Sequence, residues 1–365
     1  ISLADVTDSF TAYYNFGSQA TGVYIVMVQE GYNDKVLKSG DRITAINDQE
    51  ITSSEDVKEI IAEHLVKGRV VQRLVYNDTG ADAAEEAVNV SLNDTAFYRS
   101  QHRVALRNCG VINPENIDEY IGTRGYEALG KVLTEMTPDE VIETILASGL
   151  RGRGGGGFPT GRKWQFAKAS VSDQKYVVCN GDEGDPGAFM DRSVMEDDPH
   201  RMIEGMMIAG IACGATEGYI YVRAEYPVAV RKLRTAIAAA EELGLLGDNI
   251  LGSGFSFHMH INRGAGAFVC GEGSALTASI EGKRGMPRVK PPRTVEHGLF
   301  DKPTVLNNVE TFANVPTIIT QGAAEYVKVG TETSSGTKAF ALTGNIQNTG
   351  LIEVPMGTTL REVVF

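Results

Sequence analysis

The densest chemistry in the sequence lies in residues 149–164, which read GLRGRGGGGFPTGRKW. Four consecutive glycines let main-chain N–H groups approach a bulky anion without interference from Cβ atoms. Cations for a phosphate and aromatic faces for stacking surround them: Arg151, Arg153, Phe158, Arg162, Lys163, Trp164 and Phe166. The stretch predicts a site for a phosphorylated ligand with a ring to stack. A plain surface turn is the alternative, but flexible linkers do not usually interleave arginines and rings so densely.

Two common phosphate-binding motifs do not fit this stretch. A P-loop needs a Lys and then a Ser or Thr directly after its last glycine. Here Arg162 follows Gly161, and Trp164 follows Lys163. The dinucleotide fingerprint needs its glycines between a strand and a helix, and the pair 158–159 (Phe-Pro) interrupts that arrangement.

A second motif, CNGDEGDPGAFMDR, occupies residues 179–192 directly after a predicted strand. Asn180 can hydrogen-bond the polar edge of a ring. Asp182, Glu183 and Asp185 can accept hydrogen bonds from vicinal hydroxyls. An acidic turn on its own is more often a solvated or cation-binding loop, so this alternative stays open.

Two further segments add weaker signals. Residues 264–276, GAGAFVCGEGSAL, predict a glycine-lined turn that enters a helix N-terminus, with Glu272 in the first turn. Residues 288–293, RVKPPR, offer Lys290 to a phosphate, and residues 303–311 carry the paired amides Asn307 and Asn308.

Strands and helices alternate from residue 149 onward, and these elements must position the motifs. The patterns predict strands at 175–179, 218–223 and 255–261, and helices at 201–215, 227–243 and up to 281. Such alternation is typical of an α/β layer with a mostly parallel sheet, in which ligands bind at the carboxyl ends of the strands. The tail, 338–365, predicts a strand, a turn, a strand and a helix that stops in mid-pattern, so we expect the natural chain to continue.

The segment before the glycine-rich loop has two parts. Residues 94–148 are polar and then helical, with Thr137 and Glu140 as a capping box before an apolar face of Val141, Ile142 and Ile145. Residues 1–93 predict strands at 23–28, 42–47, 70–76 and 87–92. They also predict a helix opened by Thr52, with an apolar face that consists of Val57, Ile60, Ile61 and Leu65.

The first 93 residues resemble a PDZ domain of the kind attached to bacterial trypsin-like proteases, through GVYI at 22–25 and LKSGDRITAINDQEI at 37–51. The resemblance implies that a C-terminal peptide adds as a strand and that its carboxylate is held near residues 22–24. The alternative is a small β/α domain without a ligand.

Composition narrows the function classes. The 365 residues suggest two or three domains, and the net charge of −13 argues against nucleic acid as a partner. No apolar run reaches the roughly 18 residues of a membrane span. The four cysteines are scattered and lack the spacing of a zinc or iron–sulfur site, so we expect no metal site. Their number and scatter fit a reducing compartment, and we therefore expect the cytoplasm.

Taken together, the motifs resemble the family of flavin- and NADH-binding, 51-kDa-type subunits of respiratory complex I. They look most like the beta subunit of electron-bifurcating [FeFe]-hydrogenases, over about residues 98–365. The resemblance implies a Rossmann-like FMN- and NADH-binding domain at 149–330. This domain would follow a helical connecting segment at 94–148 and precede the start of a ubiquitin-like (SLBB) domain at 331–365.

The resemblance also implies site residues. For FMN they are Gly152, Arg153, Gly154, Lys163, Asn180, Asp182, Glu183, Phe268, Gly271, Asn307 and Asn308. For NADH they are Phe158, Phe166, Asp185, Glu272 and Lys290. No side chain acts as a catalytic acid or base, because the flavin carries the hydride. The family's [4Fe–4S] cluster belongs to a C-terminal bundle beyond residue 365.

The implied function is an FMN-dependent NADH dehydrogenase (diaphorase) module of a soluble, bifurcating hydrogenase complex. It passes hydride from NADH to FMN and then single electrons to iron–sulfur partner subunits. An NAD-linked formate dehydrogenase or another hydrogenase is the alternative complex. A peptide-binding PDZ protein with a non-functional flavin remnant is the alternative of another class. Asp185, Gly273 and Arg293 depart from the complex I pattern, and an Arg near the adenosine leaves the choice between NAD and NADP open.

Overall fold

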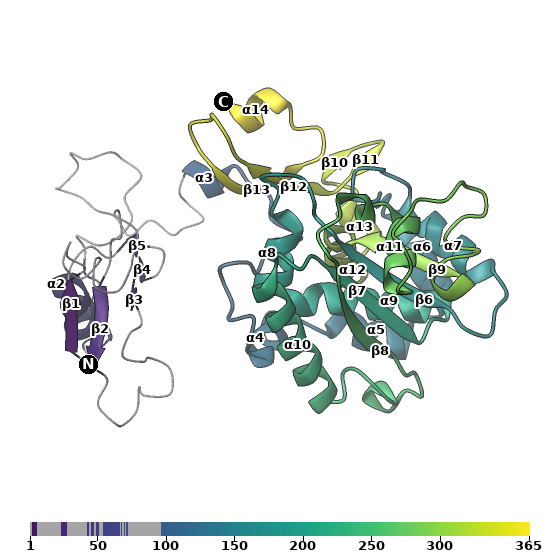
Figure 1. Cartoon of the computed structure of the whole chain (residues 1–365), viewed down its shortest axis with the longest axis horizontal. Helices are drawn as coiled ribbons and strands as arrows, with labels where there is room; N and C mark the ends of the chain where they lie inside the picture. Colours follow the sequence, from purple (N-terminus) through teal and green to yellow (C-terminus); the bar gives the residue numbers. More distant parts are fainter. Residues whose placement is uncertain are drawn as a thin grey trace. The chain divides into compact units, whose positions relative to one another are not determined.

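The computed structural model describes residues 2–5, 23–27, 42–43, 45–46, 49–50, 54–65, 67, 69, 71 and 96–365. The chain divides into two compact units, residues 1–99 and 100–365 (Figure 1). The finer division at 93, 148 and 330 stays a prediction.

The described part of the first unit is a small β/α assembly. β1 (Ser2–Asp5), β2 (Val23–Met27) and β3 (Arg42–Ile43) form an antiparallel sheet in that order. β4 (Ala45–Ile46) pairs with β5 (Gln49–Glu50), and the helices are α2 (Ser54–Glu59), η1 (Ile60–Leu65) and α3 (Ala96–Arg99). The predicted cap Thr52, most of the strand 70–76 and the strand 87–92 lie outside the described residues, as does Gly22 of the predicted peptide-binding residues 22–24, whereas residues 23 and 24 belong to β2.

The predicted apolar face of this helix is only partly correct. Val57 and Ile60 are buried, but Ile61 is 37% exposed. The reason is that residues 60–65 form a π-helical turn, which is wider than an α-helical turn and breaks the 3.6-residue repeat.

The second unit is built on a parallel sheet in the order β8-β7-β6-β9. Its strands are β6 (Tyr176–Gly181), β7 (Glu217–Val222), β8 (His258–Arg263) and β9 (Thr304–Asn308). The α/β class with a mostly parallel sheet is therefore confirmed. The predicted strand at 255–261 begins three residues too early, because Phe257 instead bridges Gly247 through two main-chain hydrogen bonds of 2.9 Å.

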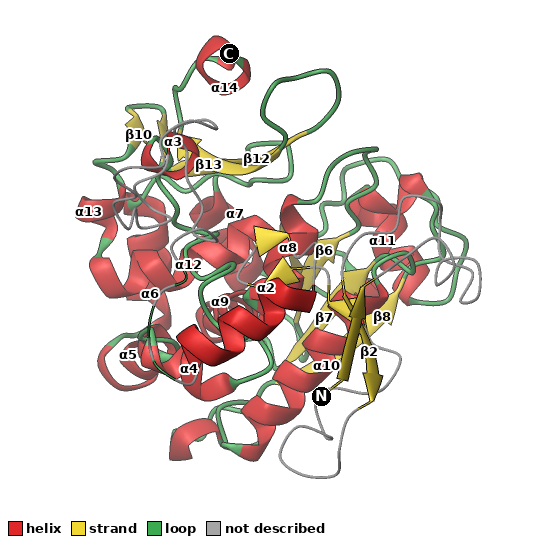
Figure 2. Ribbon diagram, turned by 90° about the vertical axis from the view of Figure 1, so that its left-hand side faces the viewer, coloured by secondary structure: helices red, strands yellow, loops and turns green. Residues whose placement is uncertain are grey.

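Helices flank this sheet (Figure 2). They are α4 (Ile117–Gly122), α5 (Glu127–Glu135), α6 (Pro138–Ala147), α7 (Thr160–Ala169), α8 (Met190–Asp197), α9 (Pro199–Cys213), α10 (Pro227–Glu242), α11 (Gly273–Ile280), α12 (Val309–Gln321) and α13 (Ala323–Tyr326). Short 3₁₀ turns add η4 (Ile250–Gly252), η5 (Phe268–Gly271) and η6 (Leu299–Asp301). The capping box of Thr137 and Glu140 at the start of α6 is confirmed.

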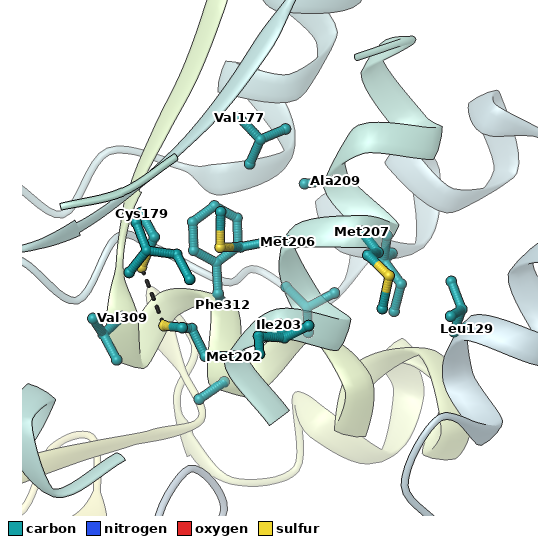
Figure 3. Packing of buried hydrophobic residues seen from close by; sticks show 14 of the residues in the cluster. Leu129, Val177, Cys179, Met202, Ile203, Met206, Met207, Ala209, Val309 and Phe312 are labelled. Atoms are coloured by element: carbon teal, nitrogen blue, oxygen red, sulfur yellow. Dashed lines mark hydrogen bonds between the residues drawn. The ribbon is translucent and has the colours of Figure 1, made fainter. Parts of the chain in front are cut away.

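The main core lies between the sheet and the helices α9 and α12. Side chains of a strand alternate between its faces, so Val177 and Cys179 of β6 point to this core, beside Met202, Met206 and Phe312 (Figure 3). Val178 points to the other face, where it joins a smaller cluster that includes Leu276 of α11 and Leu299 of η6. The sheet is thus covered on both faces, which leaves its strand ends as the place for loops and ligands.

The tail follows the predicted order of strand, turn, strand and helix. β10 (Gly330–Thr331) pairs with β11 (Ser334–Ser335), and β12 (Thr337–Leu342) pairs with β13 (Gly350–Pro355) before α14 (Leu360–Val364). Buried Glu353 of β13 accepts hydrogen bonds of 2.9–3.0 Å from the main chain of residues 104–106. Among the described helices, none is long and apolar enough to cross a membrane.

Candidate functional site

Two of the predicted motifs meet at the carboxyl ends of neighbouring strands. β6 and β9 run parallel, with Asn180 opposite Asn308 in their register. The acidic turn leaves β6 at this point, and α12 leaves β9 beside it. The fold therefore brings residues 128 positions apart in the chain to one edge of the sheet, where open α/β sheets bind their ligands.

A cleft of about 650 Å³ opens at this edge. It lies within the usual size range of ligand sites, roughly 300–1,000 Å³. Its walls come from the glycine-rich loop, the acidic turn, η5, β9 and β12. The predicted residues that line it are Arg153, Gly154, Asn180, Asp182, Glu183, Asp185, Phe268, Gly271, Glu272 and Asn308.

Glycines bring the main chain close to the cleft. A Cβ on Gly154 would lie 3.1 Å from Cβ of Asn308, and one on Gly184 would lie 2.6 Å from the Phe268 ring. Gly155 has a φ of +97°, a conformation that favours glycine. Within residues 96–365, the main-chain N–H groups of Gly154 and Gly155 donate to no protein acceptor. The loop therefore offers free donors to an anion or a polar ring edge.

Arg153 does not present its charge as predicted. Its guanidinium is buried and donates to the main-chain oxygens of Thr337 at 2.9 Å and Ser335 at 2.7 Å. Because these carbonyls lie on β12 and β11, the side chain holds the glycine-rich loop against the tail. Arg153 contributes to the shape of the cleft, while its guanidinium is already engaged.

Within the described residues, the acidic wall contains one buried carboxyl oxygen without a protein partner. The buried Oδ2 of Asp182 makes no hydrogen bond within the described residues. Burial raises the pKa of Asp182 to about 6, against the opposing effect of Arg223. An unpaired buried acceptor is costly, so this oxygen is suited to a ligand hydroxyl or N–H.

Glu183, the next predicted acid, is occupied by the protein. Its carboxylate accepts hydrogen bonds of 3.1 Å from the main chain of Asp191 and Arg192, at the start of α8. Burial raises the pKa of Glu183 despite these donors. The residue therefore orients α8 and the turn before it.

Asp191 and Lys338 line the cleft and were not predicted as site residues. Asp191 is buried, and burial followed by the charges of Glu183 and Glu310 raises its pKa well above the usual range. Lys338 pairs with Glu310. Asp191 lies inside the acidic motif of residues 179–192, so that motif could have indicated it. Lys338 reaches the cleft from a distant hairpin, for which the sequence holds no signal.

A second pocket of about 420 Å³ collects other predicted residues. It is lined by Phe158, Lys163, Phe166, Gly273, Lys290, Arg293, Thr294, Val295, Thr304 and Leu306. Glu272 lines the first cleft, Gly273 lines the second pocket, and Lys290 Nζ lies 2.8 Å from Glu272 Oε1. The cleft and the pocket therefore border each other at this ion pair.

Lys163 lies in this second pocket, although the resemblance assigned it to FMN. Its ammonium donates a 2.6 Å hydrogen bond to the main-chain oxygen of Leu306. Burial, and then the charge of Lys290, lowers the pKa of Lys163 to about 8. Two neighbouring ammonium groups favour the arrival of an anion.

Glu272 has a structural task at the border. Its carboxylate accepts hydrogen bonds from the main chain of Ser274 at 2.9 Å and Ala275 at 3.0 Å, which caps α11. Partial burial works toward a higher pKa, but Lys290, Ser274 and Ala275 outweigh it and lower the pKa to about 2. Glu272 is thus a fixed anion between the two hollows.

The remaining two predicted residues line neither hollow. Gly152 donates its main-chain N–H to Phe158 O at 2.9 Å, which closes the glycine-rich loop. Asn307 is buried, and its Nδ2 has no partner within the described residues. The paired amides therefore differ in position: Asn308 lines the cleft, whereas Asn307 is buried and lines neither hollow.

Comparison with known proteins identifies the domain. Residues 145–317 match the family model described as the Nuo51 FMN-binding domain. The NADP-reducing hydrogenase subunit HndC of Solidesulfovibrio fructosivorans is 60% identical over 271 residues, which cover 74% of this chain and 55% of that protein. An NADH-quinone oxidoreductase subunit of Rhizobium meliloti (strain 1021) is 50% identical, over 72% of this chain and 62% of the relative.

A solved structure agrees with these relatives. The NAD⁺-reducing [NiFe]-hydrogenase in its air-oxidized state matches with a TM-score of 0.60 and 37% identity, over 73% of this chain and 43% of the other. The chain spans 55% to 62% of the length of the two curated relatives. The resemblance inferred from the motifs is confirmed: residues 145–317 match the Nuo51 FMN-binding domain, and the relatives are subunits of a hydrogenase and of an NADH-quinone oxidoreductase.

Proposed function

We propose that this chain is the FMN- and NADH-binding module of an NADH:acceptor oxidoreductase. The observation that carries the proposal is the convergence of the glycine-rich loop, the acidic turn and Asn308 on one cleft at the carboxyl ends of β6 and β9. Gly154 and Gly155, whose main-chain N–H groups are free within residues 96–365, line the same cleft as Asp182, whose buried Oδ2 has no partner within the described residues. These groups fit a ligand that has both a phosphate or polar ring edge and a chain of hydroxyls.

The residues around the cleft have distinct tasks in this proposal. Gly152, Arg153 and Gly154 shape the loop against the flavin, and Asp182 accepts from its hydroxyls. Asn180 donates to Gly271 O at 2.9 Å, so it fixes the facing wall by its amide. The other proposed FMN residues are Glu183, Phe268 and Asn308 at the cleft and Asn307, which lines neither hollow, whereas Lys163 lines the second pocket and is proposed for the dinucleotide.

The dinucleotide would extend from the cleft into the second pocket. Phe158 and Phe166, 45% and 38% exposed, offer their ring faces to the adenine. Lys290 supplies charge for a phosphate, while Asp185 and Glu272 lie on the side of the cleft. When bound, FMN accepts hydride from NADH and returns electrons to one-electron acceptors. The protein's own task is to align the two ligands and to exclude water, which needs no side-chain acid or base.

The partners proposed for this module are iron–sulfur subunits of a hydrogenase or dehydrogenase complex. Two curated relatives are named as subunits of a hydrogenase and of a quinone oxidoreductase. Within the described residues, no group of three or more His, Cys, Asp or Glu could hold a metal ion. All four cysteines are buried and free, which supports a reducing compartment, and we propose the cytoplasm.

The flavin titration is the direct test. The purified chain is titrated with FMN while the visible flavin spectrum and the quenching of flavin fluorescence are followed, and NADH is then added without oxygen. We expect one FMN per chain and loss of the visible flavin band on NADH addition. Riboflavin is the control for the phosphate. If the chain leaves the FMN spectrum and fluorescence unchanged, the proposal is wrong.

The rival function concerns the first unit. A PDZ-like domain at 1–93 would bind a C-terminal peptide, and the flavin region would then be a remnant. A screen of C-terminal peptides beside the flavin titration separates the two. Peptide binding without FMN binding supports the rival, whereas FMN binding supports the oxidoreductase whatever the peptide result.

A further inference from the structure

The charged side chains that line the second pocket have one sign, and the anion Glu272 lies at its border, paired with Lys290. Within residues 96–365, the lining side chains include three cations, Lys163, Lys290 and Arg293, and no Asp or Glu. Two aromatic rings, those of Phe158 and Phe166, complete the wall. The pocket is therefore suited to an aromatic base with an anionic group, such as a phosphate, attached to it.

The three cations are not equally available. Lys163 is partly buried and donates to the main-chain oxygen of Leu306, and Lys290 pairs with Glu272. The guanidinium of Arg293 has no carboxylate partner within the described residues. The central carbon of this guanidinium, Cζ, lies 5.6 Å from the centre of the Phe166 ring. The nearby carboxylate of Glu296 accepts from the main-chain N–H of Arg293, at 2.8 Å.

Over the Phe166 ring, the guanidinium N–H groups of Arg293 donate to no protein acceptor within the described residues. A guanidinium has five donors in one plane, so a ring against its face does not block a phosphate at its edge. Dinucleotide sites that select NAD place an acid at the ribose 2′-hydroxyl, whereas an Arg nearby accommodates the 2′-phosphate of NADP. This pocket has the Arg and lacks the acid.

We propose that the second pocket holds the adenosine end of the dinucleotide and that Arg293 binds a phosphate on its 2′-oxygen. The chain then binds 2′-phosphorylated adenosine more tightly than the unphosphorylated form, and NADPH is a substrate alongside NADH. The assignment of the pocket to a dinucleotide rests on the proposed function. The lowered pKa of Lys163 agrees with an excess of positive charge in the pocket.

The test measures binding of nucleotide fragments to the whole chain by calorimetry, at fixed ionic strength and without flavin. The fragments are 5′-AMP, 2′,5′-ADP and 3′,5′-ADP. The last has the charge of 2′,5′-ADP with the phosphate on the neighbouring oxygen. We expect 2′,5′-ADP to bind about tenfold more tightly than the other two, the effect of roughly one charge-assisted hydrogen bond.

Variants assign this preference to Arg293. Arg293→Gln should lower the affinity for 2′,5′-ADP by about tenfold to a hundredfold and the affinity for 5′-AMP by less than about threefold. Arg293→Lys should keep part of the preference, because the charge remains. Arg234→Gln, which removes an exposed arginine of α10, should change neither affinity, and melting curves verify that each variant is folded.

Three results overturn the proposal. If Arg293→Gln lowers the affinities for 5′-AMP and 2′,5′-ADP equally, Arg293 contacts only the base. Equal affinities of the native chain for 2′,5′-ADP and 3′,5′-ADP would mean unspecific charge attraction. Absence of nucleotide binding would mean that the pocket is not an adenosine site. If the chain binds FMN but shows no preference for the 2′-phosphate, only the proposal for Arg293 is wrong. If it shows the preference but does not bind FMN, only the proposed oxidoreductase function is wrong.

Discussion

The amide Nδ2 of Asn308 lies 2.6 Å from Oδ2 of Asp191, although 117 residues separate them in the chain. The same Asn308 side chain accepts a 2.9 Å hydrogen bond from the main chain of Glu310 and so caps α12. One amide therefore joins the end of β9 to the starts of α8 and α12, on the wall of the cleft. The arrangement of the cleft depends on this side chain before any ligand arrives.

Asn308→Ala should destabilise the second unit. It removes the cap of α12, worth about 1 kcal/mol, and leaves the buried Asp191 carboxyl without its donor, worth roughly 1–3 kcal/mol more. Denaturation by urea, followed by the fluorescence of the single tryptophan, Trp164, reports on this unit, because Trp164 is buried within it.

The matched control for that change is Asn116→Ala. Asn116 is exposed and caps α4 through Asp118, so its loss should cost only about 1 kcal/mol. Equal losses in the two variants would show that the contact with Asp191 adds nothing to stability.

The Gly154→Ala change tests the glycine-rich loop. Its new Cβ would lie 3.1 Å from Cβ of Asn308, so Asn308 or the loop must move by a few tenths of an ångström at the cleft wall. We expect FMN affinity to fall by about tenfold or more, on the order of 1.4 kcal/mol. Gly156→Ala is the control, because its Cβ meets nothing within 4 Å and Gly156 does not line the cleft. Similar FMN affinities for the two variants would contradict a cradle at Gly154.

The sequence predicted the parts of this site that local patterns control. The parallel α/β class, the cap at Thr137 and the helix that starts at Pro227 follow from periodicity and capping residues within one element. The glycine-rich and acidic motifs also lie at the cleft, since both are loops next to elements that were predicted.

Non-local packing explains what the sequence did not show. β9 has only five residues, two of them Asn, and its partner β6 lies far away in the chain, so no periodicity marked it as a strand. Arg153 was expected to face a phosphate, but main-chain oxygens of β11 and β12 bind its guanidinium. Lys163 was expected beside the flavin, but helix α7 directs it to Leu306 and the second pocket.

Nucleotide binding in the second pocket should weaken at alkaline pH. The pKa of Lys163 is about 8, below the ordinary value of a lysine, so its ammonium loses its proton as the pH rises through 8. An anion prefers the charged form. We therefore expect the affinity for 5′-AMP to fall by about three- to tenfold between about pH 7 and pH 9.5, a range in which the phosphate stays ionised.

Lys163→Arg is the informative variant for this pH effect. A guanidinium does not titrate in this range, so the affinity profile should become flat even if the affinity itself changes. A native profile that is already flat would mean that Lys163 does not contribute its charge to the nucleotide.

Asp198 predicts a pH dependence of stability in the part of the unit away from the cleft. It is fully buried. Its Oδ2 accepts a 2.9 Å hydrogen bond from Nδ2 of Asn108, and its Oδ1 has no partner within the described residues. Burial raises the pKa of Asp198 to about 7, although Arg201, Asn108 and Arg107 act in the other direction. The native state thus holds this proton more tightly than the unfolded chain, whose Asp has a pKa near 3.9.

The sign of the effect follows from that difference. The stabilisation is complete below about pH 4 and is lost as the pH rises through 7, with a total on the order of 4 kcal/mol. Asp198→Asn cannot ionise, so its free energy of unfolding should exceed that of the native chain at pH 8 and match it more closely near pH 4.5. Urea denaturation followed at Trp164 measures both values, and Asp139→Asn, on the exposed first turn of α6, should leave the profile unchanged. If Asp198→Asn is instead less stable at pH 8, the attraction of Arg201 for the native carboxylate outweighs the cost of its burial, and the pKa of Asp198 is not raised.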